Sequence, residues 1–177
     1  MKANSTIKFL MIILCLAGLV MTANAQKKKT TTKKTTSATA PSTINNAAEI
    51  RAGADKVSMQ IKNVSRFVYL LGGIARTIED LDAEARTRKI SQASVDANNK
   101  NKQAVIQGIQ NLRAGLLALE TEFRTKPGLK LYAVRVDGIS NLVADAEGQA
   151  SAGQIVESGK TLLLVIERLS DALAALP

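Results

Sequence analysis

The residues of this chain whose spacing suggests chemistry are few, and the first group is a short motif near its carboxyl end. Ser158-Gly159-Lys160-Thr161 resembles the end of a phosphate-binding loop, in which a glycine, four further residues and GK[ST] cradle a nucleotide. Gln154 occupies the position where that loop requires glycine, and Gly153 lies one place too early. Because such a loop also follows a β-strand, we interpret the motif as part of an ordinary helix.

A second candidate, for cation binding, is a run of four carboxylates: Glu79, Asp80, Asp82 and Glu84. Carboxylates ligate calcium, but these residues point in several directions around a helix and lack the glycine spacing of a calcium loop. Three cations follow them before position 90. We therefore expect a solvated acidic face paired with basic neighbours and no metal site.

A third candidate is a serine and a lysine one helical turn apart, Ser58 and Lys62, the spacing of a Ser–Lys dyad. Serine and lysine are so common on helices that chance explains the pair. The chain contains no histidine, which excludes Ser-His-Asp catalysis, Glu-x-x-His di-iron sites and histidine-ligated haem. The sequence therefore predicts a protein that is not an enzyme, with no catalytic residue, metal or cofactor.

The amino-terminal residues predict export. Lys2 and Lys8 accompany an apolar run of 13 residues from Phe9 to Met21, and Ala23-Asn24-Ala25 fits the small-x-small rule for cleavage. A membrane-spanning helix needs about 20 apolar residues. We expect residues 1–25 to be a signal peptide, cut after Ala25, and the protein to be secreted or periplasmic.

Positive charge is concentrated in the next segment. Removing the two signal-peptide lysines from the 24 Lys and Arg leaves 22 against 15 Asp and Glu, a net charge of +7. Residues 26–43 contain no large apolar side chain, and we therefore expect them to form a disordered Lys/Thr-rich linker. Five lysines supply +5 of the charge, and we expect them to contact an anionic surface: Lys27, Lys28, Lys29, Lys33 and Lys34. The linker lacks arginine and aromatic residues, which argues against specific nucleic-acid binding.

From residue 44 onward, apolar residues recur at alternating spacings of four and three. The stripe includes Val64, Leu71, Ile109, Leu116, Ile139, Val143, Leu162 and Leu169. This pattern predicts an all-α, antiparallel up-down four-helix bundle over residues 44–177, with helices at about 45–89, 94–125, 129–149 and 152–176. Ser91 and Ser151 are expected caps, and Pro127-Gly128 an expected stop. The segment Leu129–Val136 also alternates, so a strand there is the competing prediction.

Aligning the heptads predicts which side chains of the first two helices meet. In the expected register Phe67 faces Gly115 and Ile74 faces Gly108, so that bulky groups fill gaps, and Asp82 faces Lys102 at one end of the bundle.

The same register leaves the first helix without a partner before about Ile61. The stretch around Ile50, Ala54 and Val57 is therefore predicted to overhang the bundle and to contact a partner. The partner itself is not specified by the sequence.

Taken together, these patterns predict an exported, non-catalytic helical bundle that acts as a structural or interaction module at the cell envelope. A homo-oligomer is compatible with the sequence. The alternative is a carrier of a small apolar ligand in the bundle core, where small residues leave space: Ala75, Ala146, Ser158 and Ala172.

Overall fold

The structure is a computed structural model that describes residues 41–88 and 90–177, with side chains described from residue 45 onward. The predicted signal peptide and the five linker lysines therefore lie outside the described residues. The elements are α2 (Pro41–Thr87), α3 (Gln92–Thr125), the 3₁₀ turn η2 (Lys130–Tyr132), α4 (Ala133–Val136), α5 (Ile139–Ser151) and α6 (Ile155–Ala174). The described part of the chain contains no strand, so the competing strand at Leu129–Val136 is wrong.

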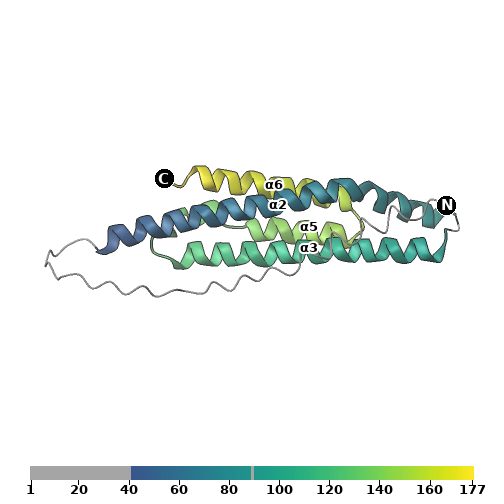
Figure 1. The fold of residues 1–177 in the computed structure, drawn as a ribbon, viewed down its shortest axis with the longest axis horizontal. Coiled ribbons are helices and arrows are strands. Elements are labelled where there is room, and N and C mark those ends of the chain that lie inside the picture. The colour runs from purple at the N-terminus through teal and green to yellow at the C-terminus, as the bar shows by residue number, and fades with distance from the viewer. Residues whose placement is uncertain (1–40, 89) are drawn as a thin grey trace, which may run out of the picture. The chain divides into compact units, whose positions relative to one another are not determined.

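The four long helices pack side by side, and successive helices run in opposite directions (Figure 1). α2 packs against α3 and α6, and α5 packs against the same two helices. The buried side chains come from the predicted apolar stripe and include Val64, Leu71, Ile109, Leu116, Ile139, Val143, Leu162 and Leu169. Their burial confirms an all-α fold of four packed helices with a core set by the heptad pattern.

Two predicted helix boundaries are confirmed. The Ser91 side chain accepts a hydrogen bond from the Ser94 N–H at 3.1 Å and so caps α3. α3 then ends at Thr125, just before Pro127. α2 begins at Pro41, earlier than the predicted residue 45, because proline is tolerated in a first helical turn, where its missing N–H would have no intrahelical partner.

The register between α2 and α3 differs from the predicted one by a heptad. A Cβ atom added to Gly108 would lie 2.3 Å from the Phe67 ring, and one added to Gly115 would lie 3.1 Å from the Gln60 amide. Phe67 therefore faces Gly108 and not Gly115. Heptad letters repeat every seven residues, so both registers match them equally well. The difference amounts to about 10 Å along the helix.

This shift removes the predicted overhang, because the end of α3 and the following turn cover the start of α2. Val57 is fully buried, and a Cβ atom on Gly53 would lie 2.6 Å from the Leu129 side chain. The Glu49 carboxylate accepts a hydrogen bond from the Gly128 N–H at 2.7 Å. The prediction of an unpaired stretch is wrong for these residues.

The predicted continuous helix at 129–149 is also wrong, because the backbone breaks at Asp137-Gly138. Asp137 is extended (φ −63°, ψ 133°), and Gly138 is left-handed (φ 78°, ψ 2°). Glycine adopts that conformation readily, which is why Asp-Gly pairs are typical of turns. α5 then continues to Ser151, so this serine ends α5 and does not cap α6.

Candidate functional site

Three carboxylates bind backbone N–H groups of elements far away in the sequence. The hydrogen bonds are 2.7–2.8 Å long and run to Glu49 from Gly128, to Glu120 from Ser140 and to Glu79 from Val156. The last two acids cap the first turns of α5 and α6, whose own N-cap residues make no side-chain hydrogen bond. The first N–H groups of a helix need such acceptors, and negative charge there also suits the helix dipole. These acids position the elements of the bundle.

The predicted acidic run does not converge on one point. Glu79 caps α6, whereas Asp82 pairs with Lys102 at 3.0 Å and accepts a hydrogen bond from Asn98 at 2.8 Å. Asp82 and Lys102 were predicted to face each other, and they do form an ion pair, although Phe67 faces a different glycine from the predicted one. Within residues 41–88 and 90–177, no group of three or more His, Cys, Asp or Glu is placed to hold a metal ion.

The motif that resembles a phosphate-binding loop lies inside α6, as predicted. The Lys160 ammonium pairs with Glu157 at 2.6 Å, and the Thr161 hydroxyl hydrogen-bonds to Gln149 at 2.8 Å. Ser158 is fully buried in the core. Lys160 and Thr161 are thus held by different neighbours, and the buried Ser158 hydroxyl has no hydrogen-bond partner among the described residues.

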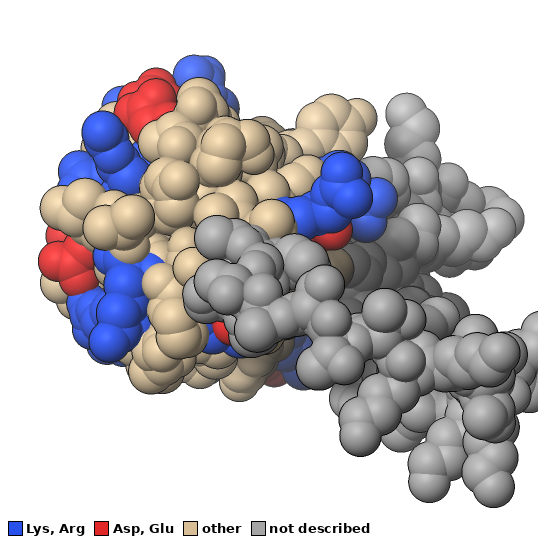
Figure 2. Space-filling model, turned by 90° about the vertical axis from the view of Figure 1, so that its left-hand side faces the viewer, with Lys and Arg blue, Asp and Glu red and all other residues tan. Residues whose placement is uncertain are grey.

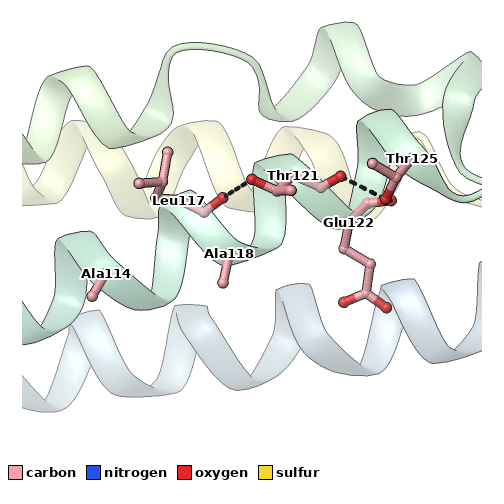
Figure 3. A pocket seen from close by; sticks show the side chains of 6 residues that line it. All are labelled: Ala114, Leu117, Ala118, Thr121, Glu122 and Thr125. Atoms are coloured by element: carbon pink, nitrogen blue, oxygen red, sulfur yellow. Dashed lines mark hydrogen bonds between the residues drawn. The ribbon is translucent and has the colours of Figure 1, made fainter.

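A shallow groove of about 560 Å³ lies on the surface of α3 and is lined by Ala114, Leu117, Ala118, Thr121, Glu122 and Thr125 (Figure 3). The hydroxyls of Thr121 and Thr125 hydrogen-bond at 2.8 Å to carbonyl oxygens of α3 itself, those of Leu117 and Thr121. Because these hydroxyls already have backbone partners, the groove offers a ligand mainly methyl and methylene groups. Glu122 is its one charged lining residue.

Glu122 is held between two lysines, Lys56 of α2 and Lys126 at the end of α3. Its partial burial opposes ionisation, but the hydrogen bonds from Lys126 and Lys56 outweigh that effect and lower the pKa of Glu122. The same contact with Glu122 raises the pKa of Lys126. Glu122 thus stays ionised, and its ion pair with Lys56 fastens α3 to α2.

A cluster of charges holds the break between α4 and α5. The Glu120 carboxylate is almost completely buried and accepts a second hydrogen bond from the Ser140 hydroxyl at 3.0 Å. Arg124 lies 3.7 Å from Glu120 and also pairs with Asp137, and this contact raises the pKa of Arg124. Arg168 of α6 donates to the Asp137 carbonyl at 3.5 Å. Groups from three helices therefore fix Asp137 and its neighbours.

The short segment before this break exposes an apolar and basic face. Leu131 is 86% exposed and Val134 73%, the highest values for large aliphatic side chains in the part of the chain that the structure describes. Lys130 and Arg135 are also exposed, and neither pairs with a carboxylate of the described residues. The other side of the segment packs against the core through Leu129, Tyr132, Ala133 and Val136. We call Lys130, Leu131, Val134 and Arg135 the corner face.

The corner face follows directly on the contact between Gly128 and the first turns of α2. In the sequence, the Lys-rich segment directly precedes α2. Figure 2 views this end of the bundle and shows several clusters of Lys and Arg side chains, with fewer acidic side chains among them.

The predicted contact residues have different outcomes. The five lysines lie outside the described residues, so their contact with an anionic surface stays a prediction. Val57 is fully buried within the chain, while Ile50 packs partly against the core and Ala54 is partly exposed.

Sequence reasoning missed the corner face. The signal that would have found it is the Asp137-Gly138 pair, which ends α4.

The residues proposed to leave room for an apolar ligand are all buried: Ala75, Ala146, Ser158 and Ala172. The groove on α3 and a second depression at the α2–α3 turn are both open to the surface, and neither is lined by these residues. Ligand carriage stays a prediction.

The fold and these contacts define an all-α four-helix protein with a basic and apolar face at one end. No protein-family model, curated protein or solved structure matches the chain. Among the helices that the structure describes, none combines the length and apolarity needed to cross a membrane.

Proposed function

We propose that this protein is an exported, non-catalytic helical-bundle module that binds an anionic surface of the cell envelope. The five lysines of the Lys-rich segment and the corner face each contribute to binding that surface. The observation that carries the proposal is the corner face, where Lys130 and Arg135 are exposed without a carboxylate partner among the described residues.

The distribution of charge supports this proposal. Five lysines of residues 26–43 carry +5 of the +7 expected after signal cleavage, so the folded part is nearly neutral overall. Each Lys or Arg close to an anionic membrane surface contributes about 1 kcal/mol to binding, and salt screens that attraction. Charge concentrated in one segment of a chain whose folded part is nearly neutral therefore favours salt-sensitive attachment through that segment.

The test compares two versions of the protein, expressed with its own amino terminus. One replaces the five lysines with glutamine, and the matched control replaces five threonines of the same segment with glutamine: Thr30, Thr31, Thr32, Thr35 and Thr36. Binding to vesicles of phosphatidylglycerol and phosphatidylcholine, and to an anionic polysaccharide resin, is measured at low and high salt.

We expect the lysine variant to lose at least about tenfold in low-salt binding, because charges of about 1 kcal/mol each are removed. The threonine variant should bind as the parent does, and both should melt at the parent's temperature. Equal binding by the lysine variant and the parent would reject the role of the segment. A parent that binds neither surface would reject the proposed function.

A further inference from the structure

We propose that η2 and α4 form a wedge that inserts Leu131 and Val134 into the surface of an anionic lipid bilayer, with Lys130 and Arg135 at the headgroups. This inference rests on the proposed function for the sign of the surface and adds its chemistry and the docking residues. The proposal distinguishes a lipid bilayer from an anionic glycan, which offers charge but no apolar layer.

The first step is the arrangement of the four residues on one short turn of helix. Residues three or four positions apart share a face, so Leu131 lies beside Val134, Lys130 beside Val134 and Leu131 beside Arg135. At 3.0 residues per turn in η2 and 3.6 in α4, the two apolar side chains occupy the middle of the exposed arc and the cations its two edges. This order matches an interfacial helix, which sinks its apolar residues below the headgroups and keeps its cations level with them.

The second step is charge complementarity. Arg124 and Arg168 lie near the same break, and the acids there already have partners: Glu120 is buried under Ser140, and Asp137 pairs with Arg124. Lys130 and Arg135 have no such partner within the described residues. The face is therefore suited to an anionic layer with an apolar interior.

The third step is rigidity. Leu129 is fully buried against Gly53, and Val136 is 1% exposed, so both ends of the wedge are anchored in the core. Between them Tyr132 and Ala133 pack against the core. A wedge that is already formed loses little conformational entropy when it inserts, and this favours binding by so small an apolar area.

The main test replaces the two apolar side chains with polar ones. Leu131→Gln/Val134→Gln should reduce partitioning into phosphatidylglycerol-containing vesicles by about tenfold or more, at both low and high salt, because apolar transfer is lost. The matched control is Tyr69→Gln/Leu70→Gln. Tyr69 is 83% exposed but lies more than about 20 Å along α2 from Gly53, so this variant should bind as the parent does.

A second variant separates charge from apolar insertion. Lys130→Gln/Arg135→Gln should weaken vesicle binding about fivefold per charge at low salt and have little effect at high salt, because salt screens headgroup attraction.

A spectroscopic readout reports insertion itself. The chain contains no tryptophan, so Leu131→Trp introduces a single reporter at the wedge and Tyr69→Trp a single reporter elsewhere. With anionic vesicles, the emission of the Leu131→Trp protein should move to shorter wavelength and be quenched by brominated lipid. The emission of the Tyr69→Trp protein should not change.

The outcomes are distinct. If the parent binds vesicles through its lysines but Leu131→Gln/Val134→Gln binds equally well and the Trp at 131 stays in water, the wedge is rejected and the proposed function stands. Binding to the polysaccharide resin alone, unchanged in the apolar variant, would assign the surface to a glycan and also reject the wedge. If the parent binds no anionic surface, both proposals fail.

Discussion

Alanine at Gly108 is expected to destabilise the bundle, although alanine is the better helix former. Replacing glycine by alanine inside a helix normally gains about 1 kcal/mol. At Gly108 the new Cβ atom would lie 2.3 Å from the Phe67 ring, whereas carbon atoms in contact sit about 3.5 to 4 Å apart. The ring or one of the helices must therefore move by more than about 1 Å. Overpacking of this kind costs about 1 to 3 kcal/mol, so the net loss is about 0 to 2 kcal/mol.

Two other glycines provide matched controls. At Gly72 an added Cβ atom meets nothing within 4 Å, so Gly72→Ala should stabilise the protein by about 1 kcal/mol. At Gly115 it meets only the end of the flexible Gln60 side chain, at 3.1 Å, so Gly115→Ala should fall between the parent and Gly72→Ala. Gly108→Ala should be the least stable of the three variants, and less stable than Gly72→Ala by about 1 to 3 kcal/mol.

The assay is urea unfolding followed by circular dichroism, with the midpoint and slope fitted for each variant. Phe67→Leu should relieve the clash, so Gly108→Ala should cost less in that background than in the parent. In the register with Phe67 against Gly115 and Ile74 against Gly108, alanine at Gly115 meets the larger side chain, so Gly115→Ala should be the less stable variant. That order, or a Gly108→Ala protein as stable as Gly72→Ala, would refute the heptad alignment described above.

Two further predictions concern buried and paired carboxylates. Glu120→Ala should destabilise the protein by about 2 kcal/mol, because it leaves the Ser140 N–H without its acceptor, whereas Glu157→Ala, which breaks an exposed pair, should cost under about 1 kcal/mol in the same urea assay. Equal costs would contradict the capping role. The pKa of Glu122 is lower in the folded protein than its ordinary value of 4.5, so its ion pairs stabilise the fold above pH 4.5 and that contribution is lost as the pH falls through the folded-state pKa. The unfolding free energy of the parent should therefore fall more steeply below pH 4.5 than that of Glu122→Gln, and parallel curves would show that these pairs contribute nothing.

The heptad pattern made the four packed helices and most of the core predictable from sequence. The local caps were predictable where a single residue decides them, as at Ser91 and at Pro127. The register between α2 and α3 was not predictable, because the heptad positions match equally well when one helix slides by seven residues. Phe67 faces a glycine in both registers, Gly108 in one and Gly115 in the other. Matching a bulky side chain to a glycine therefore did not decide between the two registers.

The corner face could not be predicted from the heptad pattern, because the helix break that forms it depends on a contact between distant parts of the chain. The apolar stripe continues through Val136 and Ile139, which both point into the core, so periodicity alone favoured one unbroken helix. The break depends on Gly138 and on Glu120, a residue from α3 that caps the next helix across space. A contact of this kind leaves no local mark in the sequence of α5.

The acids that cap from a distance have a consequence for the order in which the chain becomes structured. Glu49 and Glu79 both belong to α2, yet the N–H groups that they accept lie at Gly128 and Val156. Synthesis proceeds from the amino end, so both acceptors emerge before their donors. The α3–η2 turn and α6 can complete these hydrogen bonds only when they pack on α2, so the last helix depends on the first for the acceptor at its start.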